Sequence, residues 1–165
     1  MKITTKGVDE TIQMLERLSK NSKGIMKAGL YDGANVVANQ YKANLWNIPL
    51  EKSHNGLPRI VNAGGKKLKG VTREQKQDLI DAMGISDMED YMDNINLSIG
   101  VDGYGSIPTR SYPNGVPNAM LLRSIESGTS FRDKTPVVRP AKNSSRRRAI
   151  SSIENKIKKL LEKEK

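Results

Sequence analysis

The chain has 165 residues, a net charge of +10 and no cysteine. This length favours a single domain, and the lack of cysteine excludes disulfides, thiolate zinc sites and cysteine nucleophiles. Residues 1–7 hold no apolar run typical of a secretory signal, and no segment reaches the roughly 18–20 apolar residues that a membrane helix needs.

Two amphipathic helices are predicted in the first 48 residues. The first spans about 8–18 and is followed by a break at 19–22. The second ends before Pro49. Gly29 and Gly33 within it either allow close approach of another backbone or are tolerated at roughly 1 kcal/mol each. Its apolar stripe consists of Met26, Leu30, Ala34, Val37, Tyr41, Leu45 and Ile48.

The middle of the chain alternates between loops and short elements. Residues 50–71 carry no hydrophobic period and are predicted to form a long surface loop. Thr72 and Gln75 match a capping box, which predicts a helix over about 73–83. The acidic segment 86–93 is expected to hold one helical turn at most.

Apolar and polar residues alternate strictly from 94 to 101, which predicts a half-buried strand. Glycines and prolines then mark a long loop over 102–118. Residues 119–125 fit a short helix or a strand. The last helix is predicted from Pro140 to about Leu161, because proline suits a first helical turn and an apolar stripe begins at Ile150.

Positive charge is concentrated at the C-terminal end. Residues 139–165 contain ten Lys or Arg and three Glu, a net charge of +7. Arg146, Arg147 and Arg148 lie in the first half of the last helix, where the helix dipole does not favour cations. Two interpretations are open: an external partner such as phosphate or an acidic neighbour, or a solvated basic face.

Charge is also segregated in the middle of the chain. Residues 59–76 are basic and include Lys66, Lys67 and Lys69, whereas residues 78–93 are acidic. Opposite charges on one surface allow a copy of the same chain to dock head to tail. The alternative is ordinary surface charge.

The sequence offers no recognisable catalytic constellation. Residues 87–93 are rich in Asp but lack the glycine and glutamate positions of a calcium loop. His54 is the single histidine and cannot build a multi-histidine metal site. We therefore expect no catalytic residues, cofactor or metal site.

Two neighbouring segments carry a resemblance to a known family. Glu126-Ser-Gly-Thr129 stops at a glycine turn, and Pro136-Val-Val-Arg-Pro140 is predicted to be a short extended piece before Ala141 and the basic helix. This layout resembles the minor tail-component and head–tail joining proteins of long-tailed phages and prophages. The resemblance is strongest over 119–149, where it favours a helical turn that leads into an extended segment over 126–129; Ser127 and Val137 stand where aromatic residues are usual.

The resemblance implies an α+β fold, with a small, mainly antiparallel sheet packed against two N-terminal helices and a long C-terminal helix. It implies one domain over 1–165, with 50–94 as an insertion or loop region. Glu126, Gly128, Thr129, Pro136, Arg139, Pro140 and Ala141 would be structural motif residues.

The same resemblance implies a non-enzymatic virion protein of the tail or neck, assembled in the bacterial cytoplasm. It would form a homo-oligomeric ring with other tail or neck proteins, with DNA passing nearby and no membrane contact. The alternative is a basic nucleic-acid-binding module, for which Arg146, Arg147, Arg148, Lys66, Lys67 and Lys69 are candidate polyanion contacts; in a ring they would be candidate subunit contacts.

One pairing is expected within the motif itself. Glu126 and Arg139 both lie beside short segments that are predicted to pack. A partly buried charge needs a partner, so the two side chains either contact each other or both point into solvent.

Overall fold

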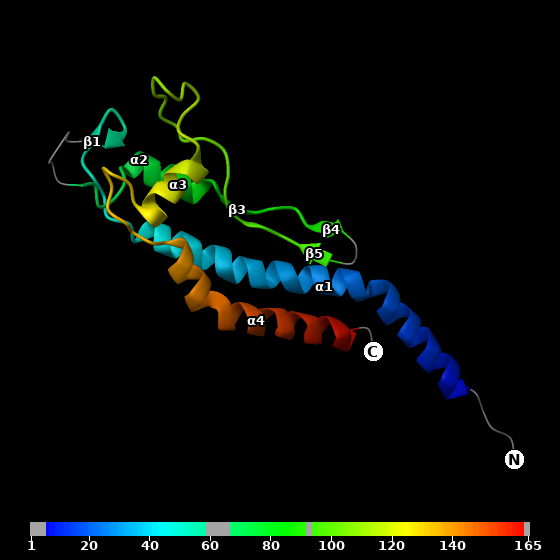
Figure 1. Ribbon diagram of the computed structural model, residues 1–165. Coiled ribbons are helices and arrows are strands. Elements are labelled where there is room, and N and C mark those ends of the chain that lie inside the picture. The colour runs from blue at the N-terminus through cyan, green and yellow to red at the C-terminus, as the bar shows by residue number, and fades with distance from the viewer. Residues whose placement is uncertain (1–5, 59–66, 92–93, 164–165) are drawn as a thin grey trace, which may run out of the picture.

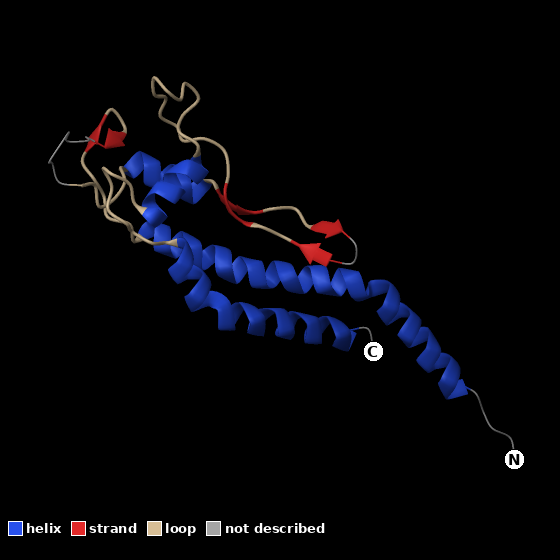
Figure 2. Cartoon of the chain, viewed as in Figure 1, coloured by secondary structure: helices blue, strands red, loops and turns tan. Residues whose placement is uncertain are grey.

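Two long antiparallel helices form an arm, most of the remaining elements form a head at one end of it, and a ribbon of short strands extends from the head along the arm (Figure 1). The computed structural model describes residues 6–58, 67–91 and 94–163, with side chains from residue 21 onward except that of Tyr91. Within these ranges, the strands form short antiparallel pairs (Figure 2). The mixed α+β prediction is therefore confirmed.

The first element, α1 (Lys6–Trp46), is one continuous helix of 41 residues. The predicted division into two helices with a break at 19–22 is wrong. Residues 19–22 contain no proline or glycine. Serine, lysine and asparagine each cost at most about 0.7 kcal/mol in a helix, too little to end one.

The last element, α4 (Val138–Lys163), returns along α1 to complete the arm (Figure 1). Gly29 and Gly33 face this helix. A methyl group added at Gly33 would lie 2.5 Å from Cγ1 of Ile153 and 3.2 Å from the carbonyl oxygen of Ala149. One added at Gly29 would lie 3.0 Å from Cγ1 of Ile157. The two glycines therefore permit close helix packing.

The predicted apolar stripe of α1 is buried only towards its C-terminal end. Ala34, Tyr41, Leu45 and, just beyond the helix, Ile48 are buried, whereas Met26 is 47% exposed. Ile25 is buried in place of Met26.

The head begins with two small elements after α1. β1 (Ser53–His54) and β2 (Leu57–Pro58) form a hairpin whose turn residues Asn55 and Gly56 both have positive φ. The predicted loop over 50–71 therefore contains a hairpin. α2 (Arg73–Asp81) starts with the predicted capping box, because Thr72 Oγ1 accepts from the Gln75 amide and the Gln75 side chain accepts from the Thr72 amide.

A broken ribbon of four short strands follows α2. β3 (Met83–Ile85) pairs with β6 (Ile99–Val101), and β4 (Glu89–Tyr91) pairs with β5 (Asn94–Asn96). The described part of the acidic segment, 86–91, contains strand residues 89–91 and no helical turn, and the single strand predicted over 94–101 is interrupted. The Ser86 hydroxyl accepts from the Ser98 amide, so a side chain replaces a backbone partner at the interruption.

The tip of this ribbon lies along α1 (Figure 1). Asp90 of β4 forms ion pairs with Lys23 and Lys27, at 3.5 and 3.4 Å. Residues 102–117 form the predicted loop and lead into α3 (Asn118–Ser127). The core lies where the head meets the arm, and its most deeply buried members are Leu45, Val71, Leu79, Ile125, Val137 and Ala141.

We predict that Gly33→Ala destabilises the protein relative to Gly24→Ala. Both glycines lie in α1, and alanine favours the helix equally at each, but nothing lies within 4 Å of the methyl group added at Gly24. Crowding against Ile153 should make the Gly33 variant less stable by roughly 1–3 kcal/mol. Urea unfolding would measure the difference. Equal stabilisation in both variants would contradict the close packing.

Candidate functional site

The family-motif residues meet at a joint between α3 and α4. Glu126, in the last turn of α3, places its carboxylate at the N-terminus of α4. Oε2 accepts from the amides of Val137 and Val138 at 2.6 and 2.8 Å, and Oε1 accepts from the Arg139 amide at 3.1 Å. These amides have no partner inside the helix and carry its positive dipole end, so the carboxylate stabilises the start of α4.

A tight turn brings Glu126 to this position. Gly128 ends α3 with a φ of 76°, and Thr129 exchanges backbone hydrogen bonds with Arg132. α3 continues through Glu126 and Ser127, so the extended segment expected there is wrong. The Gly128 amide donates to the Ser124 carbonyl oxygen, and the positive φ of Gly128 then ends the helix.

The other motif residues occupy both sides of the joint. Val137 and Ala141 are buried, whereas Pro136, Arg139 and Pro140 are exposed. α4 already begins at Val138, so the extended piece predicted over 136–140 is wrong beyond Val137. Pro140 sits in the first turn, where its missing amide costs no helical hydrogen bond.

The expected pairing of Glu126 with Arg139 takes another form. Glu126 binds the backbone amide of Arg139, while the Arg139 side chain is exposed. Burial raises the pKa of Glu126, but the three amide hydrogen bonds and the nearby Arg139 charge outweigh it, so the pKa lies below its usual value.

A second charged side chain, that of Lys76, caps the C-terminal end of α1. Lys76 of α2 is buried, and its Nζ donates to the carbonyl oxygens of Trp46 and Ile48. Burial lowers the pKa of Lys76. In the sequence, Lys76 stands out only as the last cation of the basic segment 59–76. Its spacing of three and four residues before Leu79 and Ile80, both buried, is the signal that places it on the packed face of α2.

The candidate polyanion contacts do not form one cluster. Arg146 and Arg147 are exposed on α4, but Arg148 points to α1 and donates to Oε1 of Gln40. Lys67 and Lys69 are exposed on the segment beside residues 131–135, before α4 begins. Arg146 lies about 12 Å along the helix from its start at 138. Lys66 lies outside the described residues.

Two carboxylates of the acidic segment 78–93 already have partners within the chain. Oδ2 of Asp78 accepts from the amide and hydroxyl of Ser106. Asp90 is held by the lysines of α1, and the side-chain hydrogen bond from Lys27 is the main cause that lowers its pKa. These two carboxylates are therefore less available for contact with another copy than the sequence suggested.

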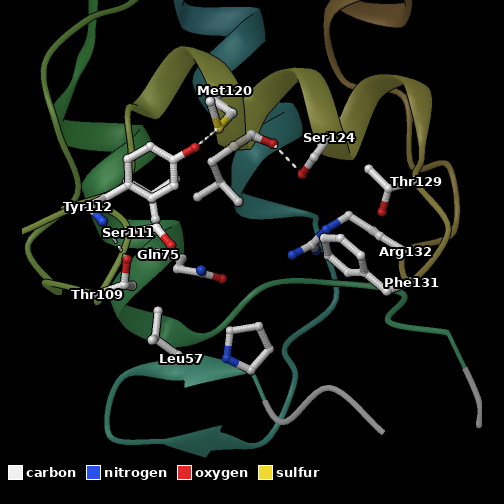
Figure 3. A pocket seen from close by; sticks show the side chains of 13 residues that line it. Leu57, Gln75, Thr109, Ser111, Tyr112, Met120, Ser124, Thr129, Phe131 and Arg132 are labelled. Atoms are coloured by element: carbon white, nitrogen blue, oxygen red, sulfur yellow. Dashed lines mark hydrogen bonds between the residues drawn. The ribbon is translucent and has the colours of Figure 1, made fainter. Parts of the chain in front are cut away.

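The head contains an apolar pocket of about 510 Å³ that the sequence did not indicate (Figure 3). Its walls come from β2, α2, α3 and the loops on either side of α3. Its lining residues are Leu57, Pro58, Gln75, Thr109, Ser111, Tyr112, Val116, Met120, Leu121, Ser124, Thr129, Phe131 and Arg132. Arg132 is 3% exposed and donates from Nη1 to the carbonyl oxygen of Gly70.

Neither metal nor membrane chemistry is indicated by the described residues. Across 6–58, 67–91 and 94–163, no group of three or more His, Asp or Glu side chains is placed to hold a metal ion. Within the same ranges, no helix has the length and apolar character to span a bilayer. The chain matches no protein-family model, no curated protein and no solved structure.

We predict that Glu126→Ala lowers the free energy of unfolding by about 2 kcal/mol, because three amides at the start of α4 lose a charged acceptor. Glu126→Gln should cost about half as much, since the amide oxygen still accepts. The matched control is Glu154→Gln, an exposed position on α4. Chemical unfolding would measure each variant, and an equal effect at both positions would contradict the capping role.

The same carboxylate predicts a pH dependence. The pKa of Glu126 is lower in the folded state, so its contribution is fully present above the ordinary carboxyl range, about pH 4 to 4.5. It is lost as pH falls through the lower folded pKa. The stability gap between the native protein and Glu126→Gln should therefore shrink between about pH 6 and pH 3. Unfolding curves at several pH values would test this, and a constant gap would contradict it.

Proposed function

We propose that the chain is a non-enzymatic structural subunit of the head–tail connection or tail top of a long-tailed phage, and that it acts by ring assembly. The observation that carries the proposal is the joint at Glu126. Three of the residues that resemble the family, Glu126, Gly128 and Ala141, cap, turn or pack at one place where the head meets the arm.

The distribution of surface features supports assembly as the mode of action. The head carries an apolar pocket, and the arm carries exposed cations on α4. These surfaces lie on separate elements that the joint holds in a fixed relation, as contacts between neighbouring subunits require.

A nucleic-acid-binding module is the second candidate, and a specific observation favours it. Arg139, Lys142, Arg146 and Arg147 are all exposed on the first half of α4. The residues at 139, 142 and 146 follow helical spacing and share one face. Phosphate contacts by such a face would give binding that falls steeply with salt.

The mass of the protein in solution and its presence in virions would test the proposal. Light scattering across concentration, at low and high salt, should show a ring or its smaller assembly unit. Tailed particles purified from the source bacterium should contain several copies of the protein per particle. A strict monomer that is absent from those particles would contradict the proposal.

Adding duplex DNA separates the two candidates. A DNA-binding module would remain monomeric and lose affinity steeply with salt, and Arg146→Gln with Arg147→Gln would reduce the salt slope by about 2. The matched control is Lys52→Gln with Lys134→Gln, which removes the same charge from exposed positions elsewhere. An equal loss in both double variants would indicate general charge attraction.

A further inference from the structure

The apolar pocket in the head contains a charge that the fold neutralises only in part. Arg132 is 3% exposed, and its Nε has no hydrogen-bond partner among the described residues. Oγ1 of Thr129, which also lines the pocket, is buried and likewise has no partner there. Figure 3 shows the guanidinium end of Arg132 on the pocket side of its backbone.

Glu51 is the acidic residue whose charge acts on Arg132, but it does not fully neutralise the guanidinium. Burial lowers the pKa of Arg132 and the charge of Glu51 partly offsets it, yet no ion pair joins the two within the described part of the chain. Oε1 of Glu51 instead accepts from the amides of Lys69 and Gly70. A buried cation without a counter-ion costs several kcal/mol, so an arriving carboxylate would gain an uncommonly strong pairing.

The mouth of the pocket has the opposite character. Phe131 is 40% exposed and Met120 is 47% exposed. Tyr112 lies beside Met120, with its hydroxyl 3.3 Å from the methionine sulfur. Exposed aromatic and methionine side chains around a concave pocket are typical of protein docking sites.

We infer that this pocket binds a short segment of a partner protein that presents a bulky apolar side chain next to a carboxylate. The apolar side chain fills the space between Leu57, Met120 and Phe131, and the carboxylate accepts from Nε of Arg132 and from Oγ1 of Thr129. The pairing of this carboxylate with Arg132 sets the direction in which the segment binds. The source of the segment, a neighbouring protein of the connector, rests on the proposed function.

Blocked tetrapeptides would test the site on the full-length protein. One carries phenylalanine followed by glutamate, and the other carries phenylalanine followed by glutamine. Nuclear magnetic resonance titration should show shifts at the methyl groups of Leu57 and Met120 and at the Arg132 Nε–H. The glutamine peptide should bind roughly tenfold more weakly. Equal binding of both peptides, or no shifts at these groups up to 10 mM, would overturn the inference.

Variants separate the pocket from general charge attraction. Ser111→Trp fills the mouth from an exposed loop position and should abolish binding without touching Arg132. Arg132→Gln should reduce the preference for glutamate to less than twofold if it folds. Lys134→Gln removes a nearby exposed cation outside this pocket and should leave binding unchanged. A stronger effect of Lys134→Gln than of Ser111→Trp would overturn the site.

Two further outcomes identify the source of the segment. The same pocket shifts, appearing without peptide as protein concentration rises, would support the site and assign the segment to a second copy of this chain. Glutamate-dependent peptide binding by a protein absent from tailed particles would support the site and overturn the proposed function. The peptide titration does not require ring assembly, so the docking site and the proposed function can be contradicted independently.

Discussion

Two charged side chains hold the arm to the head, and the rest of the structure depends on them. α1 ends and α4 begins at the same place, so the negative end of one helix dipole lies near the positive end of the other. The head supplies Lys76 to the carbonyls at the end of α1 and Glu126 to the amides at the start of α4. Each charge has the sign that its helix end favours.

This arrangement gives Glu126, Gly128 and Ala141 structural roles at one joint. Glu126 needs a glycine nearby, because α3 must end abruptly for the chain to turn back. Val137 and Ala141 must be small enough to pack where α4 starts, and both are almost fully buried. The motif residues thus specify the angle at which a long helix leaves a small head.

The head itself has little regular structure and relies on polar contacts between loops. The buried guanidinium of Arg132 joins the loop after α3 to Gly70, and the carboxylate of Glu51 accepts from the amides of the same segment. Such contacts order the loops, but they leave Nε of Arg132 without a partner within the described residues. One buried cation therefore both joins these loops and lines the pocket.

The sequence by itself determined the elements whose signals are local. The capping box placed the start of α2, glycine and proline spacing gave the loop before α3, and the alternation from 94 to 101 predicted which side chains are more exposed. The long basic C-terminal helix also followed from its first-turn proline and its apolar stripe, whereas the α+β class was implied by the resemblance over 119–149. Each of these local signals lies within a few neighbouring residues, so the sequence alone contains it.

Tertiary structure decided everything that needs a distant partner. The glycines of α1 matter only because Ile153 and Ile157 of α4 lie against them. Lys76 and Glu126 became caps because the fold brings them to helix ends some 28 and 11 residues away. The pocket around Arg132 joins segments that no local pattern connects, because packing and electrostatics act through space and not along the chain.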